Sequence, residues 1–374
     1  MRKLRAGIIG TGFIAATAHI PALLNLQDSV EIVAAADDRP EAVREAGERF
    51  RIPHIYTDPY KMLQENQLDL VHVCTANNTH KAFSIAALRA GANVLCEKPF
   101  ALTLADAREM FDEAHKAGRK LIACQNLRMG AMQDIRDIIA SGILGDLYFV
   151  EIEMLRRRGV PTWGRFHVKA DSGAGCLCDV GVHFIDAALY AMGNPKPKAV
   201  CAFTNNALAT KGLSNQETAG VVTGDKPFVY RKDYDYRDFD VEDIAGGMVS
   251  FENGLQMMFK CSWAINIPIS NYYRFAGTKG GLVYDRGSGR TNPVTLSGIV
   301  NGYMADTELQ IPSARPDAMQ DVGHRALIRH IVEDVLIGGK DCVIREEETL
   351  NVVSIIEAVY RSARLGRSVE ISEL

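Results

Sequence analysis

The sequence predicts an α/β protein of two domains, the first built on a parallel sheet and the second on a largely antiparallel one. In residues 1–125, short β-branched runs alternate with helical stretches, which is the order that builds parallel sheets. From Asp146 onward, longer strand patterns are joined by hairpin signals such as Asn253-Gly254. A chain of 374 residues also exceeds the roughly 250 to 300 residues at which a single core stops growing. We therefore expect one domain over residues 1–125 and a second over residues 126–374.

The individual elements follow in order. Strand patterns in the first domain are Leu4–Ile9, Val30–Ala36, Leu70–Cys74, Val94–Glu97 and Lys120–Cys124. Thr103 and Asp106 form a capping-box-like start to a helix that Gly118 ends. Strand patterns in the second domain are Asp146–Arg158, Met248–Glu252, Leu255–Trp263, Tyr272–Gly277 and Leu282–Asp285, and helical patterns are His324–Ile337 and Leu350–Ala363. Whether the C-terminal helix packs back on the first domain stays open.

Composition and charge favour a small-molecule partner. The formal net charge of -4 and the pI near 6.2 provide no positive field for nucleic acid or anionic lipid. No stretch reaches the roughly 18 apolar residues of a membrane helix, and no secretory signal pattern follows Met1, so we expect a cytoplasmic protein. Cys176 and Cys178 lack the paired spacing of a zinc site, and we expect no metal.

A glycine-rich turn follows the first strand pattern. Gly10, Thr11, Gly12, Phe13 and Ile14 precede Ala15 in a Gly-x-Gly-x-x-Ala motif that opens a helix. In such a turn the first glycine permits a tight bend, and the second lets the backbone approach a pyrophosphate at the helix N-terminus. The motif predicts a Rossmann domain with Gly10 to Ile14 at a dinucleotide.

Two further segments are expected to line the cofactor. Asp37 ends the second strand pattern, where a carboxylate accepts hydrogen bonds from the adenosine ribose and repels a 2′-phosphate. NAD is therefore favoured, although Arg39 nearby leaves NADP as the alternative, and a solvated arginine is an equally good interpretation of that residue. Thr75 and Asn77 follow the strand pattern that ends at Cys74, at the edge where ligands of open α/β sheets bind.

The residue best placed for catalysis in the first domain is Lys98. It stands between Glu97 and Pro99 at the end of a strand pattern, and Pro99 favours an extended conformation that fixes where the ammonium points. A lysine there contacts both the nicotinamide ribose and the substrate hydroxyl. An ordinary surface lysine is the alternative.

A second group of titratable residues follows a glycine-rich loop. If the segment is a regular helix, Asp179, His183 and Asp186 share one face. A histidine between carboxylates is oriented for general acid and base work near neutral pH. A lone histidine is usually structural, so the prediction depends on the pairing of His183 with Asp179.

These motifs resemble the glucose–fructose oxidoreductase/inositol dehydrogenase/rhizopine catabolism family. The likeness includes Thr75-x-Asn77-x-x-His80, Glu97-Lys98-Pro99, Asp179-x-x-x-His183, Val241-Glu242-Asp243 and Tyr360-Arg361-Ser362-Ala363, and it covers essentially the whole chain. It implies a C-terminal α/β domain on a large open, mostly antiparallel sheet, through which the chain forms a homodimer or homotetramer. It also implies that Lys98, Asp179 and His183 are catalytic and bind substrate, and that His80, Glu97 and Lys98 belong to the cofactor site. One departure is Gly173-Ala174-Gly175-Cys176, where Gly-Gly-Gly commonly precedes the aspartate.

Four further side chains are candidates for contact with substrate. Arg128 faces the cleft in the family's pattern, Trp163 is suited to stacking on a sugar face, and Arg156 and Arg165 are suited to hydroxyls or a carboxylate. Packing or a solvated face is the alternative for each.

The expected function is NAD-dependent hydride transfer between the cofactor and a carbinol or ketone of a sugar, sugar derivative or cyclitol. One alternative keeps the cofactor but is redox-neutral: a transient keto-sugar permits elimination or hydrolysis, and the hydride then returns. Another is a non-catalytic NAD-binding regulator, which has no need of Lys98, Asp179 and His183. The sequence does not name the substrate or the direction.

Overall fold

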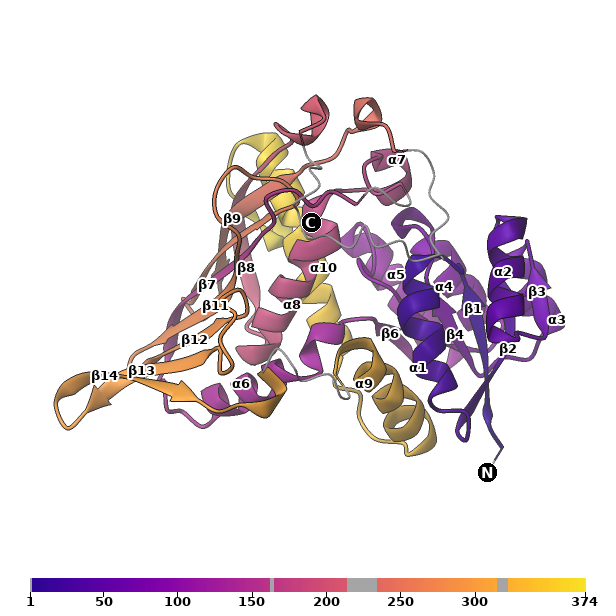
Figure 1. The fold of residues 1–374 in the computed structure, drawn as a ribbon, viewed down its shortest axis with the longest axis horizontal. Coiled ribbons are helices and arrows are strands. Elements are labelled where there is room, and N and C mark those ends of the chain that lie inside the picture. Colours follow the sequence, from indigo (N-terminus) through magenta and orange to yellow (C-terminus); the bar gives the residue numbers. More distant parts are fainter. Residues whose placement is uncertain (1, 162–164, 214–233, 315–321) are drawn as a thin grey trace.

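The computed structural model describes residues 2–161, 165–213, 234–314 and 322–374. Two sheets lie side by side, with helices packed between and around them (Figure 1). The N-terminus lies at the first sheet, and the C-terminal segment adds a short edge strand to the second. The predicted α/β architecture is confirmed.

The first sheet has six parallel strands in the order β3-β2-β1-β4-β5-β6. Its strands are β1 (Leu4–Ile9), β2 (Val30–Ala36), β3 (His54–Tyr56), β4 (Leu70–Val73), β5 (Asn93–Cys96) and β6 (Leu121–Ala123). β4 and β6 are buried along their whole length, as parallel strands covered on both faces must be. The order reverses between β1 and β4, which is where doubly wound sheets bind their ligands. β3 has only three residues, and no strand was predicted there.

Helices α1 (Ile20–Leu24), α2 (Pro40–Phe50), α3 (Pro59–Glu65), α4 (His80–Arg89) and α5 (Leu104–Ala117) pack around this sheet. A π-helical turn, η1 (Ala15–His19), precedes α1. The Thr103 side chain accepts a hydrogen bond from the Asp106 amide, and α5 ends at Gly118 in the left-handed conformation. The predicted start and end of this helix are thus confirmed.

The second sheet has nine strands in the order β14-β13-β12-β11-β7-β10-β9-β8-β15. They are β7 (Leu147–Leu155), β8 (Pro197–Asn205), β9 (Ile244–Phe251), β10 (Gln256–Ser262), β11 (Ser270–Gly277), β12 (Gly281–Asp285), β13 (Val294–Val300), β14 (Tyr303–Leu309) and β15 (Val369–Glu370). Every pair of neighbours is antiparallel except β7 and β10. The predicted hairpins at residues 253–254 and 279–281 are therefore confirmed, whereas β8 and the β13–β14 hairpin were not predicted.

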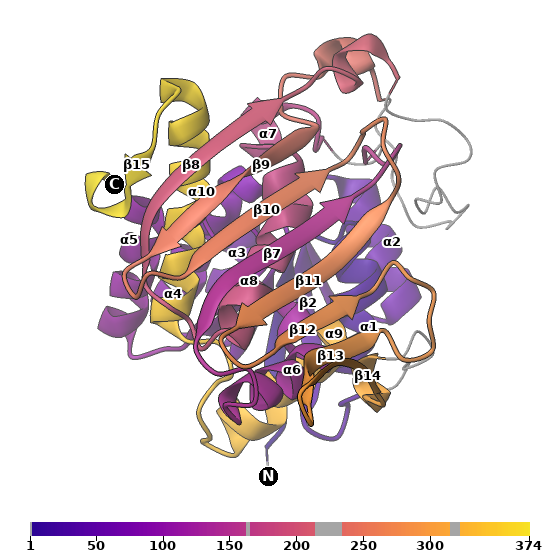
Figure 2. The same cartoon turned by 90° about the vertical axis from the view of Figure 1, so that its left-hand side faces the viewer.

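Helices α6 (Ala131–Ala140), α8 (Val182–Ala191) and α10 (Glu346–Leu365) cover one face of this sheet, and none of the described helices covers the other face (Figure 2). A short helix, α7 (Lys169–Ser172), and a π-helical turn, η4 (Leu177–Gly181), lead into α8. The segment Lys169–Ala191 is long and apolar enough to cross a membrane by length and composition, but 89% of the window concerned is buried inside the protein. We therefore interpret it as a core helix.

Each sheet has its own hydrophobic core, but the first core is not drawn only from residues 1–125. Leu327 and Ile328 of α9 (Gly323–Arg329) and Ile331 and Val332 of the following turn η8 (His330–Ile337) belong to it. Val353 of α10 also packs there, so the C-terminal helix contacts both units. The domain boundary at residue 125 stays a prediction, with residues of α9, η8 and α10 returning to the first core.

Candidate active site

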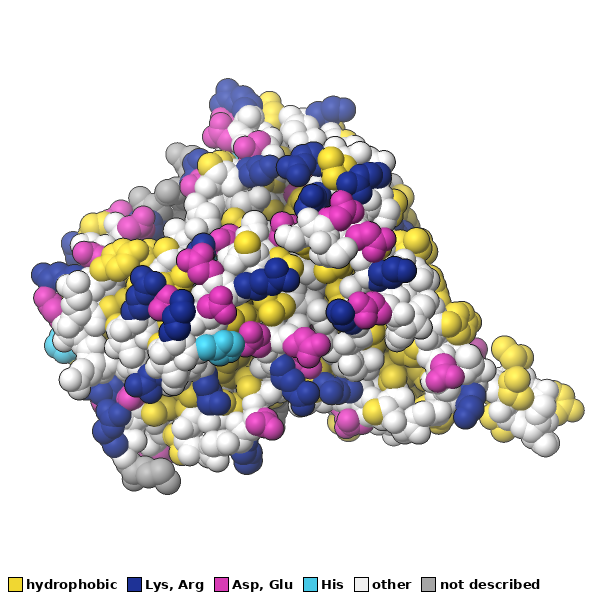
Figure 3. All heavy atoms as spheres, turned by 180° about the vertical axis from the view of Figure 1, so that it is seen from behind, with side chains coloured by type: hydrophobic (Ala, Val, Ile, Leu, Met, Phe, Trp, Pro, Cys, Tyr) yellow, Lys and Arg dark blue, Asp and Glu magenta, His cyan; other side chains and the backbone are white. Residues whose placement is uncertain are grey.

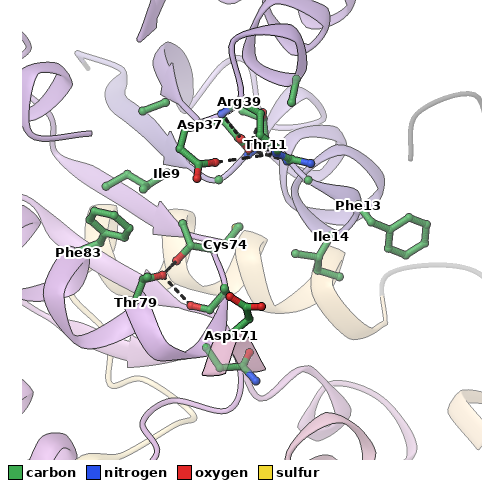
Figure 4. A pocket seen from close by; sticks show the side chains of 18 of the residues that line it. Ile9, Thr11, Phe13, Ile14, Asp37, Arg39, Cys74, Thr79, Phe83 and Asp171 are labelled. Carbon is green, nitrogen blue, oxygen red and sulfur yellow. Dashed lines mark hydrogen bonds and ion pairs between the residues drawn. The ribbon is translucent and has the colours of Figure 1, made fainter. Parts of the chain in front are cut away.

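A cavity of about 480 Å³ lies at the carboxyl ends of β1, β2 and β4. Figure 4 shows Thr11, Asp37 and Arg39 meeting on one side of it, with Phe13 and Ile14 extending from the start of the first helix. The residues predicted for a dinucleotide that line this cavity are Gly10, Thr11, Gly12, Phe13, Ile14, Asp37, Arg39, Thr75 and Asn77. The structure therefore brings nine of the twelve predicted cofactor residues to one cavity.

The glycine turn leaves room where a phosphate would approach. Gly10 has φ +88, and a Cβ there would lie 2.6 Å from the Cys74 carbonyl oxygen, so the bend requires glycine. At Gly12, the nearest atom to an added Cβ is a guanidinium nitrogen of Arg39 at 3.8 Å. The space above Gly12 is therefore bounded by a flexible cation rather than by backbone, which suits an anionic pyrophosphate.

Asp37 is held in its charged form at the edge of the cavity. Its carboxylate accepts hydrogen bonds from the Thr11 amide at 2.8 Å and from Arg39 Nε at 2.8 Å. Burial opposes the charge, but the hydrogen bonds and positive charge of Arg39 outweigh it and lower the pKa of Asp37. Arg39 is thus an ion-pair partner of Asp37 rather than a solvated arginine.

Hydrogen bonds from the loop that follows β4 join the cavity to the second unit. Asn77 Nδ2 donates to the Ser172 carbonyl at 2.7 Å, and the neighbouring Asn78 Nδ2 donates to the Ala170 carbonyl at 2.9 Å. These bonds fix α7 over the carboxyl edge of the first sheet. Thr75 accepts a hydrogen bond from the Thr79 hydroxyl at 2.7 Å.

His80 and Glu97 do not line this cavity. The buried His80 ring lies with Nδ1 2.8 Å from the Pro99 carbonyl and Nε2 3.2 Å from the Thr75 carbonyl, so it joins two loops of the site rather than facing the cavity. Glu97 is 3% exposed, and its carboxylate faces His19 and His324. Contact of these two residues with the dinucleotide therefore stays a prediction, because neither is among the residues that line this cavity.

Lys98 and Asp179 meet between the two units. Lys98 Nζ donates to Asp179 Oδ1 and to the Asp179 carbonyl, both at 2.9 Å. Burial favours the neutral forms of both groups, but the attraction between them raises the pKa of Lys98 and lowers that of Asp179. The positive charge of Arg156 also lowers the pKa of Asp179. The resting site therefore contains a charged ion pair.

Trp263 is a functional residue that the sequence analysis missed. It follows β10, and its Nε1–H donates to Asp179 Oδ2 at 2.8 Å while its ring is fully buried. Each oxygen of Asp179 thus has its own donor, Lys98 on one and Trp263 on the other. The end position of Trp263 in a predicted strand was the one available signal.

His183 does not pair with Asp179 as predicted. Within the described part of the chain, its Nδ1 is buried and has no hydrogen-bond partner. Burial first, and the positive charge of Lys98 second, lower the pKa of His183 to about 3. The ring is therefore neutral and carries no fixed partner on Nδ1, although it lies close enough to Lys98 to be influenced by its charge.

Asp186 and Arg128 form a separate structural cluster. Arg128 is fully buried, and its Nε and Nη2 donate to the Asp186 carboxylate at 2.9 and 2.6 Å. It also pairs with Glu348 at the start of α10. The prediction that Arg128 faces the cleft is wrong, and Asp186 pairs with Arg128 rather than with His183. Asp179 lies in the π-helical turn η4, so the regular helix assumed for residues 179–186 begins only after it.

The glycine loop before Asp179 is organised by Glu242. The Glu242 carboxylate accepts hydrogen bonds from the amides of Gly175 at 2.9 Å and Leu177 at 3.0 Å, and from the Tyr360 hydroxyl at 2.7 Å. A Cβ at Gly175 would lie 2.1 Å from the Glu242 carbonyl oxygen. Glycine is therefore required at 175, whereas Ala174 is accommodated in the core.

The remaining predicted substrate residues are separated by the structure. Arg165 lines the dinucleotide cavity and pairs with Asp171, which places it on the cofactor side. Arg156 is partly buried and lies near the Lys98–Asp179 pair. Trp163 lies outside the described residues.

Comparison with known proteins agrees with this geometry. Residues 4–124 match the model of an oxidoreductase family with an NAD-binding Rossmann fold, and residues 132–283 match the GFO/IDH/MocA C-terminal domain. The chain is 31% identical to D-glucoside 3-dehydrogenase of Escherichia coli over 98% of its own length and 97% of that protein. The chain belongs to the Gfo/Idh/MocA oxidoreductase family.

Other members of the Gfo/Idh/MocA family are similar over their whole length. D-apiose dehydrogenase of Paraburkholderia graminis is 27% identical over 100% of this chain and 91% of that protein. The crystal structure of aldose-aldose oxidoreductase from Caulobacter crescentus, complexed with glycerol, superposes with a TM-score of 0.75 at 26% identity, covering 99% of this chain and all of that one. The chain is thus an oxidoreductase with the complete two-part architecture of the family.

NAD fits the Gfo/Idh/MocA site as the structure presents it. The open approach at Gly12 accommodates a pyrophosphate, and Asp37 lies at the end of β2, where a ribose would sit. The cavity walls also carry apolar side chains, including Phe13, Ile14 and Phe83. These features agree with the NAD-binding description of the matching family model.

Proposed function

We propose that the protein is an NAD-dependent dehydrogenase that interconverts a carbinol and a ketone on a sugar, a sugar derivative or a cyclitol. The observation that carries this proposal is the ion pair between Lys98 and Asp179 at the carboxyl edge of the cofactor sheet. A neutral histidine, His183, lies near this pair, and a proton acceptor together with a hydrogen-bond donor to the hydroxyl oxygen supports oxidation of an alcohol. The names of the similar proteins, D-glucoside 3-dehydrogenase and D-apiose dehydrogenase, support a sugar substrate.

In this proposal Lys98, His183 and Asp179 each have a separate role in the reaction. Lys98 Nζ donates a hydrogen bond to the reacting hydroxyl and stabilises the negative charge that develops on its oxygen. His183, neutral because of its lowered pKa, accepts the hydroxyl proton at a ring nitrogen. Asp179, fixed by Trp263, keeps Lys98 charged and directed at the site. Bound NAD supplies the hydride acceptor for oxidation, and its reduced form supplies the donor for the reverse reaction.

Arg156 is the candidate for a second contact with substrate. The positive charge of Arg156 acts on the pKa of both Lys98 and Asp179, so Arg156 lies near them. A substrate hydroxyl bound to Arg156 would therefore lie close to the reacting carbon. Stacking of Trp163 on a sugar face remains a prediction. We assign Arg165 to the cofactor side instead, because it lines the dinucleotide cavity.

NAD rather than NADP is the proposed cofactor. The Asp37 carboxylate lies at the cavity edge and is held charged, so it would repel a 2′-phosphate. Arg39 is engaged by Asp37, and a phosphate would have to compete with that ion pair.

The uncovered face of the second sheet supports a homodimer or homotetramer. Phe203, Met248 and Met258 project from three strands of this face, and Met248 pairs directly with Met258 across β9 and β10. The β13–β14 hairpin extends from the body with exposed hydrophobic side chains, visible at the right of Figure 3, where Met304 is 83% exposed. Charges of both signs are interspersed on the face shown there, which gives no support to a nucleic-acid partner. A cytoplasmic location remains a prediction.

The test is a screen of alkyl glucosides, aldoses and inositols with NAD and NADP, following the near-ultraviolet absorbance of reduced nicotinamide. We expect net reduction of NAD with at least one glycoside or cyclitol. Product formation without net absorbance change would indicate redox-neutral chemistry through a transient keto-sugar. NAD binding without turnover on any compound would favour the non-catalytic regulator.

A further inference from the structure

Four side chains that bind metal ions well meet beside Lys98. His19 ends the turn η1, Glu97 and Cys124 follow strands β5 and β6, and His324 lies in α9. One ligand atom from each, an imidazole nitrogen, a carboxylate oxygen, a thiol sulfur and a second imidazole nitrogen, lies within 4.8 Å of all the others. Across residues 2–161, 165–213, 234–314 and 322–374, this is the one group of such side chains that converges in this way.

The spacing of these atoms suits a tetrahedral ion. His19 Nε2 lies 2.8 Å and His324 Nε2 lies 3.1 Å from Glu97 Oε1. Ligands at about 2.0 to 2.3 Å from zinc, at tetrahedral angles, are about 3.3 to 3.8 Å apart. Both separations at Glu97 are shorter than that range, and all other pairs of ligand atoms lie within 4.8 Å, so the four atoms surround one point and would move slightly apart at Glu97 to hold an ion.

The charges also balance. A thiolate and a carboxylate together carry two negative charges, and two neutral imidazoles carry none, so a divalent cation makes the set neutral. Neutrality matters here because His19 and Cys124 are fully buried and Glu97 is 3% exposed. The mixture of nitrogen, sulfur and oxygen donors is typical of zinc.

The outer contacts of the two histidines fit metal ligation at Nε2. His19 Nδ1 lies 2.9 Å from His72 Nδ1, so a proton on Nδ1 has an acceptor. Asn126 Nδ2 lies 3.0 Å from His324 Nδ1, while the buried Asn126 Oδ1 has no partner in the described chain. Rotating this amide by half a turn lets Oδ1 accept the His324 Nδ1 proton and leaves the Nε2 lone pair directed at the cluster.

We propose that His19, Glu97, Cys124 and His324 bind a single zinc ion in a closed, four-coordinate site. Since the protein supplies all four ligands, the ion has no open position for substrate and acts structurally. It joins α9 to the carboxyl edges of β5 and β6. It also fixes Glu97, whose other oxygen accepts the Lys98 amide at 3.0 Å, and so positions the backbone of Lys98.

No metal was predicted from the sequence because these ligands are far apart in the chain. Here Glu97 is 78 residues from His19 and 227 residues from His324. The four ligands come together only because α9 packs in the first core. The inference does not depend on the proposed substrate, since zinc binding is measured directly.

The experiment is metal analysis of the full-length protein produced with added zinc and then dialysed to remove loosely held ions. We expect about one zinc ion per chain by inductively coupled plasma mass spectrometry. Cobalt in place of zinc should give the near-ultraviolet charge-transfer band of a cobalt–thiolate bond, which Cys124→Ser should abolish. Asn126→Ala should weaken zinc affinity by about 10- to 100-fold, as is usual for loss of an outer partner.

Matched controls separate ligation from folding. Cys261→Ser removes another buried thiol and His115→Ala removes a histidine on α5, and both should retain zinc. If Cys124→Ser does not fold, His324→Ala decides, because the His324 side chain is 18% exposed and less critical to packing. Zinc that is absent from the wild type, or that survives both Cys124→Ser and His324→Ala, would overturn the proposal and leave the cluster as a hydrogen-bonded network around Glu97.

Discussion

The dinucleotide cavity and the cluster of Lys98, Asp179 and Trp263 lie at the same edge of the first sheet but are assembled differently. In the cavity, the Thr11 amide and hydroxyl meet Asp37 across 26 residues, within one strand–helix–strand unit. In the cluster, Lys98 reaches Asp179 across 81 residues, and Trp263 reaches it across a further 84. The first region depends on local geometry, whereas the second depends on how two sheets dock. The two regions should therefore respond separately to substitution.

The largest expected effect is that of His183→Ala on turnover. Loss of a positioned general base typically lowers kcat by about 10² to 10⁴-fold, and NAD affinity should change little because the cavity is untouched. Steady-state kinetics and fluorescence titration with NAD measure both. Retention of full activity would mean that another group accepts the hydroxyl proton and that His183 is not the general base.

The pH dependence of kcat/KM tests the same role of His183. The pKa of His183 is lowered to about 3, and that of Lys98 is raised. The base form of His183 is then present above about pH 4, so kcat/KM for oxidation should show no acid limb near the ordinary histidine pKa of about 6.5. A fall in kcat/KM below that pH which disappears in His183→Ala would contradict the lowered pKa.

Asp179→Asn should have a smaller effect. The amide still accepts a hydrogen bond from Trp263 but no longer holds the Lys98 ammonium by charge, and such charged hydrogen bonds contribute about 1.5 to 3 kcal/mol. We expect kcat to fall by about 10- to 100-fold. The alkaline limit of activity should also move to lower pH, because Asp179 is the main contributor to the raised pKa of Lys98. An unchanged alkaline limit would show that Asp179 does not act through Lys98.

Asp37→Ser tests the first region alone. Removal of the carboxylate releases Arg39 to bind a 2′-phosphate, so the ratio of NADP to NAD affinity should rise by about tenfold or more. With saturating cofactor, kcat should stay within about threefold of wild type, because Asp37 does not contact Lys98, Asp179 or Trp263. A large loss of kcat at saturation would show that the two regions are coupled.

The smallest effect is expected for Trp263→Phe. The change removes one hydrogen bond to Asp179 but keeps an aromatic ring against Phe239. A neutral donor contributes about 0.5 to 1.5 kcal/mol, so kcat should fall by roughly two- to tenfold. Tyr148→Phe, at an exposed residue of β7, is the control and should leave kcat unchanged. A loss as large as that of Asp179→Asn would mean that the tryptophan also supports the fold of the site.

The same contrast explains what the sequence could predict. The Gly10 turn, the position of Asp37 and the start of α5 at Thr103 follow from spacing within short segments, and the structure shows each of them as expected. The cluster was predicted only in part. Asp179 was placed by assuming a regular helix, but it lies in the π-helical turn η4, and it pairs with Lys98 and Trp263 rather than with His183.

Other features had no local signal at all. Trp263 reaches Asp179 only because η4 packs against β10, a contact between segments distant in sequence. Arg128 was expected in the cleft but is buried by Asp186 and Glu348, since α8 and α10 both pack over it. His324 joins Glu97 only because α9 packs in the first core. Contacts of this kind are set by tertiary packing rather than by spacing along the chain.

The most direct test of the separation between the two regions is Lys98→Ala, with NAD affinity and turnover measured on the same preparation. Lys98 lies in the reacting geometry but contributes only a small part of the binding energy of a dinucleotide, so the dissociation constant for NAD should stay within about tenfold while kcat falls by about 10² to 10⁴-fold. Lys81→Ala, which removes a surface lysine paired with Asp106 and Glu109, is the control and should change neither. Turnover at the wild-type rate in Lys98→Ala, or a loss of NAD binding as large as the loss of kcat, would contradict the account.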